Sequence, residues 1–398
     1  MSLKKICLFP PLSPQYGVVD VFTAQLAAAL EKLGIEAPIV HIDKENPKEF
    51  LMQLVINPPD CTLSFNGLLP DQSGNFLCDL IRIPHVAYLI DAPTHFFTLT
   101  KSPLNIITCV DKSFAQAFTD ANFPHVIFLP HAANTDIQVS PQQKRPYDVL
   151  ILNSFIDYQA IRQGWEKRYS SEFCHVLDEA VELTLKDPQK TSLQAFIGTF
   201  DKHLRQGEAL NPTQIDYELI LDELDAYIGG KSRTELFRAI KGGKVDVFGS
   251  NAEGWREALK SNPDIQVHEP VNFEQAIELM KKAKIIVHCK PEMKQGLHER
   301  ILNGLACGAL VLAPESPFIS SIFQHGKEIL LYPHSDAQQV NSLISHYLKH
   351  EDERHQIATQ GQAKVLAQHT WDQRAATLIQ ELPPILERIK ERIKASQE

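Results

Sequence analysis

The stretch KQGLHERILNGLACGALVLAP, residues 294–314, decides how the second half of the chain is interpreted. Its first half is polar and chargeable, its middle consists mainly of small residues, and it closes with an apolar run that is typical of a buried strand. Small residues allow a helix end to pack closely on a sheet. The stretch therefore predicts a helix with a polar start, followed directly by a strand of a parallel sheet.

Short apolar runs alternate with helical patterns on both sides of this stretch. Because the runs do not strictly alternate with polar residues, they favour parallel strands that are covered on both faces. The sequence therefore predicts an α/β fold with two Rossmann-like, doubly wound domains, at residues 1–140 and 141–375. The expected strands are KICLFP, EAPIVHI, CTLSFN, HVAYLID, IITCVD and HVIFLP in the first domain, and YDVLILNS, KVDVFGS, IQVHEP, KIIVHC, ALVLA and EILLYP in the second.

Strand signals are scarce between residues 157 and 239, where long helical patterns take over. We interpret these residues as a helical insertion in the second domain, since they are too many for a loop. The insertion can pack on its host domain, contact a protein acceptor or form a homodimer interface. A C-terminal helix is expected over residues 376–398, in a helical pattern interrupted at Pro383 and Pro384.

Bulk composition limits the classes of function. The 398 residues are 43% hydrophobic and 22% charged, as in ordinary globular proteins, and the formal net charge is −10. That charge speaks against a general nucleic-acid binder, which needs a basic surface. Seven scattered cysteines without a C-x-x-C motif indicate buried thiols rather than a disulfide framework or a zinc site. No signal peptide or membrane-spanning run is recognised, so a cytoplasmic, non-transmembrane protein is expected.

The predicted helix start in the opening stretch has the chemistry of an anion site. Backbone N–H groups and the dipole at a helix N-terminus attract phosphate or diphosphate. Gly296 allows a ligand to approach the backbone, Arg300 can add a fixed charge and Lys294 a mobile one. Glu299 can accept hydrogen bonds from sugar or ribose hydroxyls. An ordinary amphipathic helix with a solvated charged end explains the same residues equally well.

The run GLHERILNGLACGALVLAPES resembles the donor-binding segment of group-1 glycosyltransferases of the GT-B fold. Its G-x-x-E-R helix start is most similar to the branch of the spore-maturation protein CgeB. Four further segments resemble that branch in the same order along the chain. They are IPHVAYLIDAPTHFF, VDVFGSNAEGW, VHEPVNFEQAIELMKKAKIIVHC and TWDQRAATLI.

The resemblance implies a hexosyltransferase-like enzyme that moves a sugar from a nucleotide-diphosphate sugar to a glycan, protein or small-molecule acceptor, without any further cofactor. It also implies a set of residues that hold the donor. These are Gly17, Gly249, His268, Lys294, Gly296, Leu297, His298, Arg300 and Asn303.

The chain departs from the family pattern at one place. The two glutamates that many retaining members carry fall here on Gln295 and Asn303, and Glu299, which is the predicted catalytic carboxylate of this segment, replaces them only in part. Retention of stereochemistry is therefore not implied. No D-x-D motif occurs, which disfavours the metal-dependent GT-A class and predicts a site without metal.

The segment DAPTHFF is the best candidate for acceptor chemistry in the first domain. Asp91 and His95 follow an expected strand, and a carboxylate with an imidazole can deprotonate a hydroxyl. Phe96 and Phe97 suit the faces of sugar rings. A simple turn with an exposed histidine is the alternative. His131 is expected either between the domains or in catalysis.

Two other functions remain open on the same fold. One is an enzyme that does not transfer sugar, such as a sugar-nucleotide epimerase. The other is a regulatory protein that binds a nucleotide sugar in a decayed site, which the missing glutamates keep open. Turnover of a nucleotide sugar with and without acceptor separates the three.

Overall fold

The computed structural model describes residues 3–11, 17–42, 45–140, 142–334 and 336–395. The chain divides into two compact units, Met1–Asp136 with Leu366–Glu398, and Ile137–Val365. Residues 366–375, assigned to the second domain from sequence, thus lie in the first unit. Arg374 explains this placement, because its guanidinium donates to the carbonyls of Pro130 and His131.

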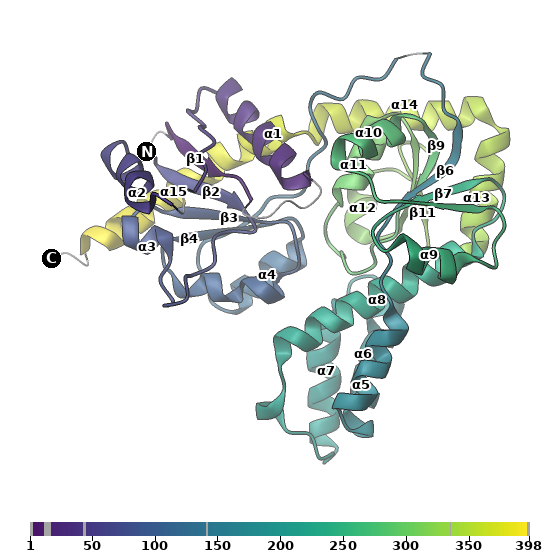
Figure 1. Cartoon of the computed structure of the whole chain (residues 1–398), viewed down its shortest axis with the longest axis horizontal. Helices are drawn as coiled ribbons and strands as arrows, with labels where there is room; N and C mark the ends of the chain where they lie inside the picture. The colour runs from purple at the N-terminus through teal and green to yellow at the C-terminus, as the bar shows by residue number, and fades with distance from the viewer. Residues whose placement is uncertain (1–2, 12–16, 43–44, 141, 335, 396–398) are drawn as a thin grey trace. The chain divides into compact units, whose positions relative to one another are not determined.

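The first unit is built on a five-stranded parallel sheet in the order β1-β2-β3-β4-β5 (Figure 1). Its strands are largely buried, as the apolar runs predict. They are β1 Ile6–Phe9, β2 Cys61–Phe65, β3 His85–Leu89, β4 Asn105–Cys109 and β5 Val126–Phe128.

One expected strand of this sheet does not form. The run EAPIVHI contributes only isolated bridges, Lys5 to Glu36 and Leu8 to Ile39. Pro38 lies between the two bridges and has no N–H to donate, so a continuous ladder is interrupted there.

Helices surround the first sheet. Helix α1 packs on β1, β2 and α15, and α4 packs on β4 and β5. The helices are α1 Val18–Lys32, α2 Pro47–Ile56, α3 Leu77–Ile81, α4 Lys112–Asp120, the 3-10 helix η1 Pro93–Lys101 and α15 Trp371–Ala395.

The expected interruption of the last helix at Pro383 and Pro384 is wrong. Helix α15 runs through both prolines. Leu382 and Leu386 on either side of them are fully buried. Packing of this apolar face therefore outweighs the hydrogen bonds that the two prolines cannot make.

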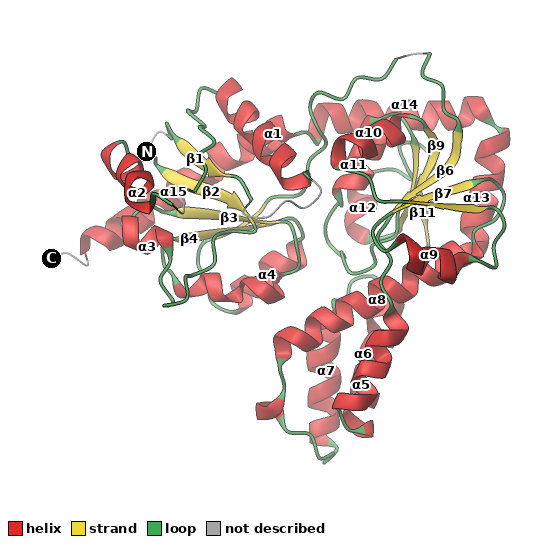
Figure 2. Ribbon diagram, viewed as in Figure 1, coloured by secondary structure: helices red, strands yellow, loops and turns green. Residues whose placement is uncertain are grey.

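The second unit contains a six-stranded parallel sheet in the order β11-β10-β9-β6-β7-β8. Helices cover both of its faces (Figure 2), which confirms the doubly wound prediction. The strands are β6 Tyr147–Leu152, β7 Val245–Phe248, β8 Ile265–His268, β9 Ala283–Val287, β10 Leu310–Pro314 and β11 Leu330–Tyr332. The helices are α9 Ala252–Leu259, α10 Phe273–Lys281, α11 Glu299–Ala306, α12 Pro317–Ile322, α13 Ala337–Lys349 and α14 Glu351–Gln368.

Four helices lie between β6 and β7, over the residues where the sequence predicts an insertion. They are α5 Tyr158–Arg168, α6 Ser171–Lys186, α7 Ser192–Arg205 and α8 Tyr217–Ala239, with the 3-10 helix η2 Pro212–Gln214 before α8. They share a core of their own, which includes Trp165, Phe196 and Leu224. The end of α8 belongs instead to the core of the sheet through Leu236 and Phe237. The insertion is therefore a small helical bundle fastened to the sheet by α8.

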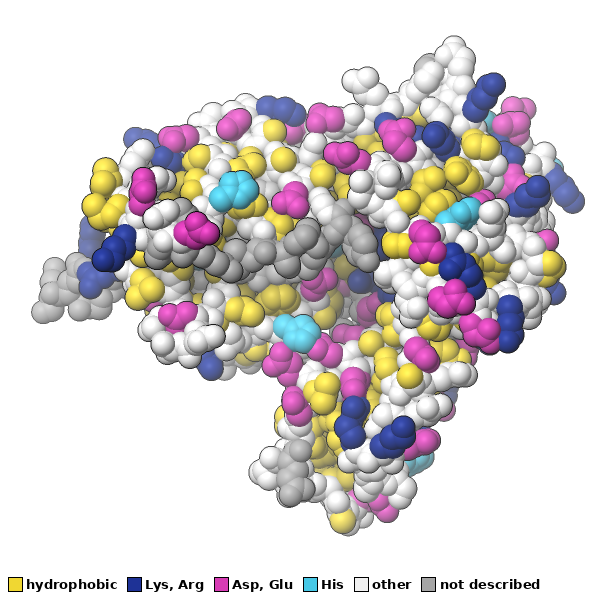
Figure 3. Space-filling model, viewed as in Figure 1, with side chains coloured by type: hydrophobic (Ala, Val, Ile, Leu, Met, Phe, Trp, Pro, Cys, Tyr) yellow, Lys and Arg dark blue, Asp and Glu magenta, His cyan; other side chains and the backbone are white. Residues whose placement is uncertain are grey.

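The distribution of charged side chains and the state of the cysteines agree with what the sequence composition predicts. On the face shown in Figure 3, acidic and basic side chains are interspersed. All seven cysteines are buried and free. Among the described residues, no helix has the length and apolar character needed to cross a membrane.

Candidate functional site

Helix α11 and the strand after it form as the opening stretch predicts. The helix begins at Glu299 with His298 as its N-cap, and it leads through Gly308, whose φ is +67°, into β10. A Cβ on Gly304 would lie 3.0 Å from Ile286 and from Val311. The close packing expected of the small residues is thus confirmed, and it fixes the helix start at the carboxyl edge of the sheet.

Arg300 lies in the first turn of α11 and reaches toward the end of β6. Its guanidinium donates to Asn153 Oδ1 at 3.1 Å, and its Nε lies 3.6 Å from Glu299 Oε1. Burial lowers the pKa of Arg300 and Glu299 opposes that change, but a guanidinium keeps its charge. The side chain remains about one-third exposed, so the charge is available to an anion.

The ends of β6 and β7 are packed too tightly for any residue but glycine at position 249. A Cβ there would lie 1.9 Å from the carbonyl oxygen of Asn153. The backbone N–H of Asn153 donates to the carbonyl of Phe248. The missing side chain at Gly249 thereby allows Asn153, the partner of Arg300, to lie in this position.

His268 ends β8 on the same edge. Its ring stacks on Phe248 with centroids 4.2 Å apart, and its Nε2 lies 2.7 Å from Asp246 Oδ1. The ring of Phe248 is buried and that of His268 is partly exposed, so His268 offers a flat surface beside the β7 and β8 ends, at a position that the family resemblance assigns to the donor.

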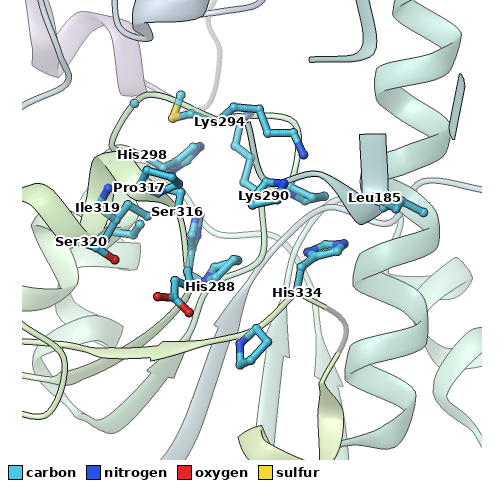
Figure 4. Close-up of a pocket in the computed structure, with 18 of the residues that line it drawn as sticks. Leu185, His288, Lys290, Lys294, His298, Ser316, Pro317, Ile319, Ser320 and His334 are labelled. Carbon is cyan, nitrogen blue, oxygen red and sulfur yellow. Dashed lines mark hydrogen bonds between the residues drawn. The ribbon is translucent and has the colours of Figure 1, made fainter. Parts of the chain in front are cut away.

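A pocket of about 680 Å³ opens at the ends of β9, β10 and β11 (Figure 4). Among the predicted donor residues, Lys294, Gly296 and His298 line it. It is bordered by the loop that leads from β9 to α11, by the segments after β10 and β11, and by the end of α6. Sequence reasoning missed this last wall, because the contact joins residues far apart along the chain.

The other predicted donor residues lie elsewhere. Gly249, His268 and Arg300 occupy the β6–β7–β8 side of α11 or its start rather than the pocket lining, and so does Glu299, a predicted catalytic residue. Leu297 and Asn303 are fully buried, so side-chain contacts with a ligand are not supported for them.

Three histidines of the pocket are neutral at neutral pH. Burial lowers the pKa of His288 and of His298 well below the usual value, and it lowers that of His334 to about 4. The rings of His288 and His298 lie 4.9 Å apart. His298 Nδ1 lies 2.5 Å from Glu299 Oε2 and 3.3 Å from the backbone N of Arg300. As the N-cap of α11, this nitrogen accepts from the backbone N–H of Arg300.

Lys294 is not the mobile charge that the sequence predicts. It is 6% exposed, and its Nζ donates to the carbonyl oxygens of Thr184 at 2.8 Å and Asp187 at 3.3 Å, at the end of α6. Arg233 of α8 pairs with Glu292 at 2.7 Å in the same loop. The insertion therefore holds the loop before α11 at two points.

The first unit presents Asp91 at the end of β3. Its carboxylate accepts from Asn66 Nδ2 at 2.8 Å, and Asn66 Oδ1 accepts from the N–H of Ile90. His95 follows in η1, and both Asp91 and His95 are exposed.

The neighbouring aromatic rings face inward instead of offering a sugar platform. Phe96 is 8% exposed, and Phe97 packs on Phe118 with centroids 4.9 Å apart. His131 is buried and lies edge-on to Phe22. Its carbonyl is held by Arg374, so this segment has a packing role within the first unit.

Gly17 is the N-cap of α1, with φ of +73° and open space where a Cβ would lie. The left-handed backbone explains the glycine. Residues 12–16 of the predicted loop lie outside the described part of the chain.

Residues 233–380 match the family model described as glycosyl transferase-like. Comparison with curated protein sequences finds no match.

Solved structures of similar fold include several glycosyltransferases. A glycosyltransferase from Rickettsia africae has a TM-score of 0.56 and 11% identity, over 97% of this chain and 99% of that one. Anabaena HepE in complex with UDP and glucose has a TM-score of 0.52 and 12% identity, over 98% and 100%. Sucrose-phosphate synthase from Thermosynechococcus elongatus has a TM-score of 0.51 and 10% identity, over 99% and 100%. The chain thus has a GT-B-like fold, and it carries a glycosyl transferase-like region at residues 233–380.

Proposed function

We propose that the protein transfers a sugar from a nucleotide-diphosphate sugar to the hydroxyl of an acceptor, without a catalytic metal ion. The observation that carries the proposal is Arg300, an arginine with a partly exposed side chain in the first turn of α11, within the region that matches the glycosyl transferase-like family. A helix N-terminus and a fixed cation together suit a leaving diphosphate.

The geometry supports one orientation of the donor. The diphosphate lies at the start of α11, where the positive end of the helix dipole and Arg300 can bind its oxygens. The nucleoside lies toward β7 and β8, where the Phe248–His268 pair can stack on a base. The G-x-x-E-R start of α11 also supports our proposal that the protein belongs to the CgeB-like branch of these glycosyltransferases.

The same arrangement supports a mechanism without a catalytic metal ion. Charge that develops on the diphosphate is neutralised by the helix dipole and Arg300 instead of a divalent ion. The groups of described residues with metal-ligand spacing lie on α6 and α7 and on α13 and α14, rather than at α11.

A nucleotide-sugar-binding protein without transfer activity is the second candidate. It is favoured by Gln295 and the buried Asn303 at positions where many relatives in the resemblance carry glutamates. Transfer of the sugar requires further catalytic residues in addition to the groups that hold the donor. Binding of the nucleotide sugar does not require them.

Calorimetry against UDP, GDP, ADP and CMP, followed by turnover of the matching nucleotide sugar, tests the proposal. Binding of one nucleoside diphosphate, weaker binding of its monophosphate and release of the diphosphate with acceptor are expected. Binding without any release would favour the second candidate, and no binding of any nucleotide would overturn both.

A further inference from the structure

The strand order divides the carboxyl edge of the second sheet into three parts. The Phe248–His268 pair lies at β7 and β8, Arg300 and Asn153 meet at the end of β6, and the 680 Å³ pocket lies at β9, β10 and β11. A donor with its nucleoside toward β8 and its diphosphate at α11 extends toward β10 and β11. On the proposed function, a sugar next to the diphosphate therefore enters this pocket.

The pocket is larger than a diphosphate needs, and the insertion forms one wall. Leu185, Lys186 and Pro188 line it from the end of α6, opposite Ser316 and Ser320 (Figure 4). The position of this wall is fixed by the hydrogen bonds from Lys294 to the carbonyls of Thr184 and Asp187.

The lining carries a surplus of positive charge. Lys186, Lys290 and Lys294 face it, against the single carboxylate of Glu315. In the described part of the chain, Lys290 forms no ion pair or side-chain hydrogen bond, whereas Lys294 is engaged with the insertion. An unpaired ammonium group in a concave site attracts an anionic ligand.

His288 supplies a second, independent sign of a ligand. It is 3% exposed and lines the pocket. Among the described residues, its Nδ1 has no hydrogen-bond partner. A buried polar nitrogen left unpaired is costly, so such groups normally have a partner. A ligand hydroxyl or carboxylate in the pocket provides one.

We propose that this pocket binds a sugar that carries an anionic group, a carboxylate or a phosphate, with Lys290 as its ion partner and His288 as a hydrogen-bond partner. The inserted helices close the pocket and limit the size of the sugar. The anionic sugar belongs either to the donor or to the acceptor, and the two sources share this chemistry.

Calorimetry with matched probes tests the charge preference. The first pair is the glucose and the glucuronate ester of the nucleoside diphosphate that binds most tightly. The second is glucose and glucose 6-phosphate, added to the protein alone and to protein saturated with that diphosphate. The variant is Lys290→Met, and its control is Lys282→Met, at an exposed lysine after α10.

At least one anionic probe should bind about ten- to a hundredfold more tightly than its neutral counterpart, as expected for a charge-assisted contact. Lys290→Met should abolish the preference, and Lys282→Met should keep it. A preference in the first pair assigns the anion to the donor, and a preference in the second pair alone assigns it to the acceptor. Equal binding in both pairs, or a preference that survives Lys290→Met, overturns the proposal.

The second pair also separates this inference from the proposed function. If no nucleoside diphosphate binds, the proposed function fails, and glucose 6-phosphate on the free protein still tests the pocket.

Leu185→Trp tests the wall. A larger side chain at the end of α6 should weaken binding of the sugar ester at least tenfold and leave the affinity for the free nucleoside diphosphate unchanged. Ile197→Trp, at an exposed position of α7, is the control and should change neither. An unchanged affinity of Leu185→Trp for every sugar probe would show that the insertion does not border the sugar.

Discussion

The Nζ of Lys294 donates to the carbonyl oxygen of Thr184 at 2.8 Å and so links the loop before α11 to the inserted helices. Thr184 lies in the last turn of α6, where carbonyl groups have no partner within the helix. A cation at a helix C-terminus is also favoured by the helix dipole. The lysine thus joins the loop before α11 to the end of α6, and the proposed donor site requires these two segments in fixed relative positions.

Lys294→Met should remove this link and destabilise the second unit by about 1–3 kcal/mol, because buried carbonyls lose their donor. Hydrogen exchange of residues 290–298 should become faster, and nucleotide affinity should fall. Chemical denaturation and exchange with mass spectrometry measure both effects. Lys260→Met, at the exposed C-cap lysine of α9, is the control. Exchange as slow as in the wild type would show that the loop does not depend on Lys294.

Arg300→Ala should weaken nucleoside diphosphate binding by about 1.5–3 kcal/mol, the usual contribution of a charge-assisted hydrogen bond. Binding of the monophosphate should weaken by a smaller free energy, since its single phosphate makes fewer contacts with the helix start. Calorimetry with both ligands gives the two differences. Arg205→Ala, at an exposed arginine of α7 paired with Asp201, should bind like the wild type. Wild-type affinity of Arg300→Ala would remove this residue from the donor site.

Metal removal should leave transfer intact. The proposed mechanism stabilises the leaving diphosphate with α11 and Arg300, so a chelator has no catalytic ion to withdraw. The initial rate is measured after dialysis against EDTA, with and without added magnesium or manganese. Complete loss of activity that either metal restores would refute the metal-independent mechanism.

The stability of the insertion should depend on the protonation of His203. This buried imidazole on α7 lies between the carboxylates of Glu179 and Glu208, with Lys202 and His175 nearby. Its hydrogen bond to Glu179 raises its pKa above the usual 6.5, and Glu208 adds to this effect. A raised folded-state pKa stabilises the fold below the unfolded value and loses this contribution as the pH rises through the folded value.

His203→Gln should therefore lower the denaturation midpoint more at pH 6 than at pH 9. Urea unfolding, followed by circular dichroism at both pH values, measures the difference. His175→Gln is the control, because this neighbouring histidine is exposed and forms no ion pair among the described residues. An equal loss at both pH values would mean that His203 acts by packing alone.

The sequence predicts the sheets well because their strands are continuous apolar runs bounded by polar turns. Eleven of the twelve expected strands form, and the exception contains Pro38. The start of α11 was also predictable, since its polar residues and Gly296 precede a run of small residues. Local pattern decides these features, and the surrounding fold does not alter them.

Features that depend on tertiary packing were not predictable. The sequence suggests a solvated Lys294, but the end of α6, more than a hundred residues earlier, captures its Nζ. It also suggests a break at Pro383 and Pro384, but a buried face carries α15 through both. Likewise, successive residues of α11 point to different sides, so Arg300 reaches Asn153 whereas Ile301 lines the pocket.

The acceptor-side base is expected in the first unit. Asp91 follows β3 at the carboxyl edge of a parallel sheet, the edge at which doubly wound folds bind ligands. Its contact with Asn66, which ends β2, fixes the carboxylate, and His95 stands exposed in the next turn. We expect His95 to accept the proton of the acceptor hydroxyl and Asp91 to orient the acceptor.

His95→Ala should then reduce transfer by roughly 10²–10⁴-fold, the typical contribution of a general base, and leave nucleotide affinity nearly unchanged. Asp91→Asn should reduce transfer less and raise KM for the acceptor. Initial rates over a range of acceptor concentrations, with calorimetry of the nucleotide, separate the two effects. His41→Ala, at another exposed histidine of the first unit, should behave like the wild type. Wild-type rates for both His95→Ala and Asp91→Asn would exclude this pair, and Glu299 at the start of α11 would be the next residue to substitute, because its carboxylate lies beside Arg300.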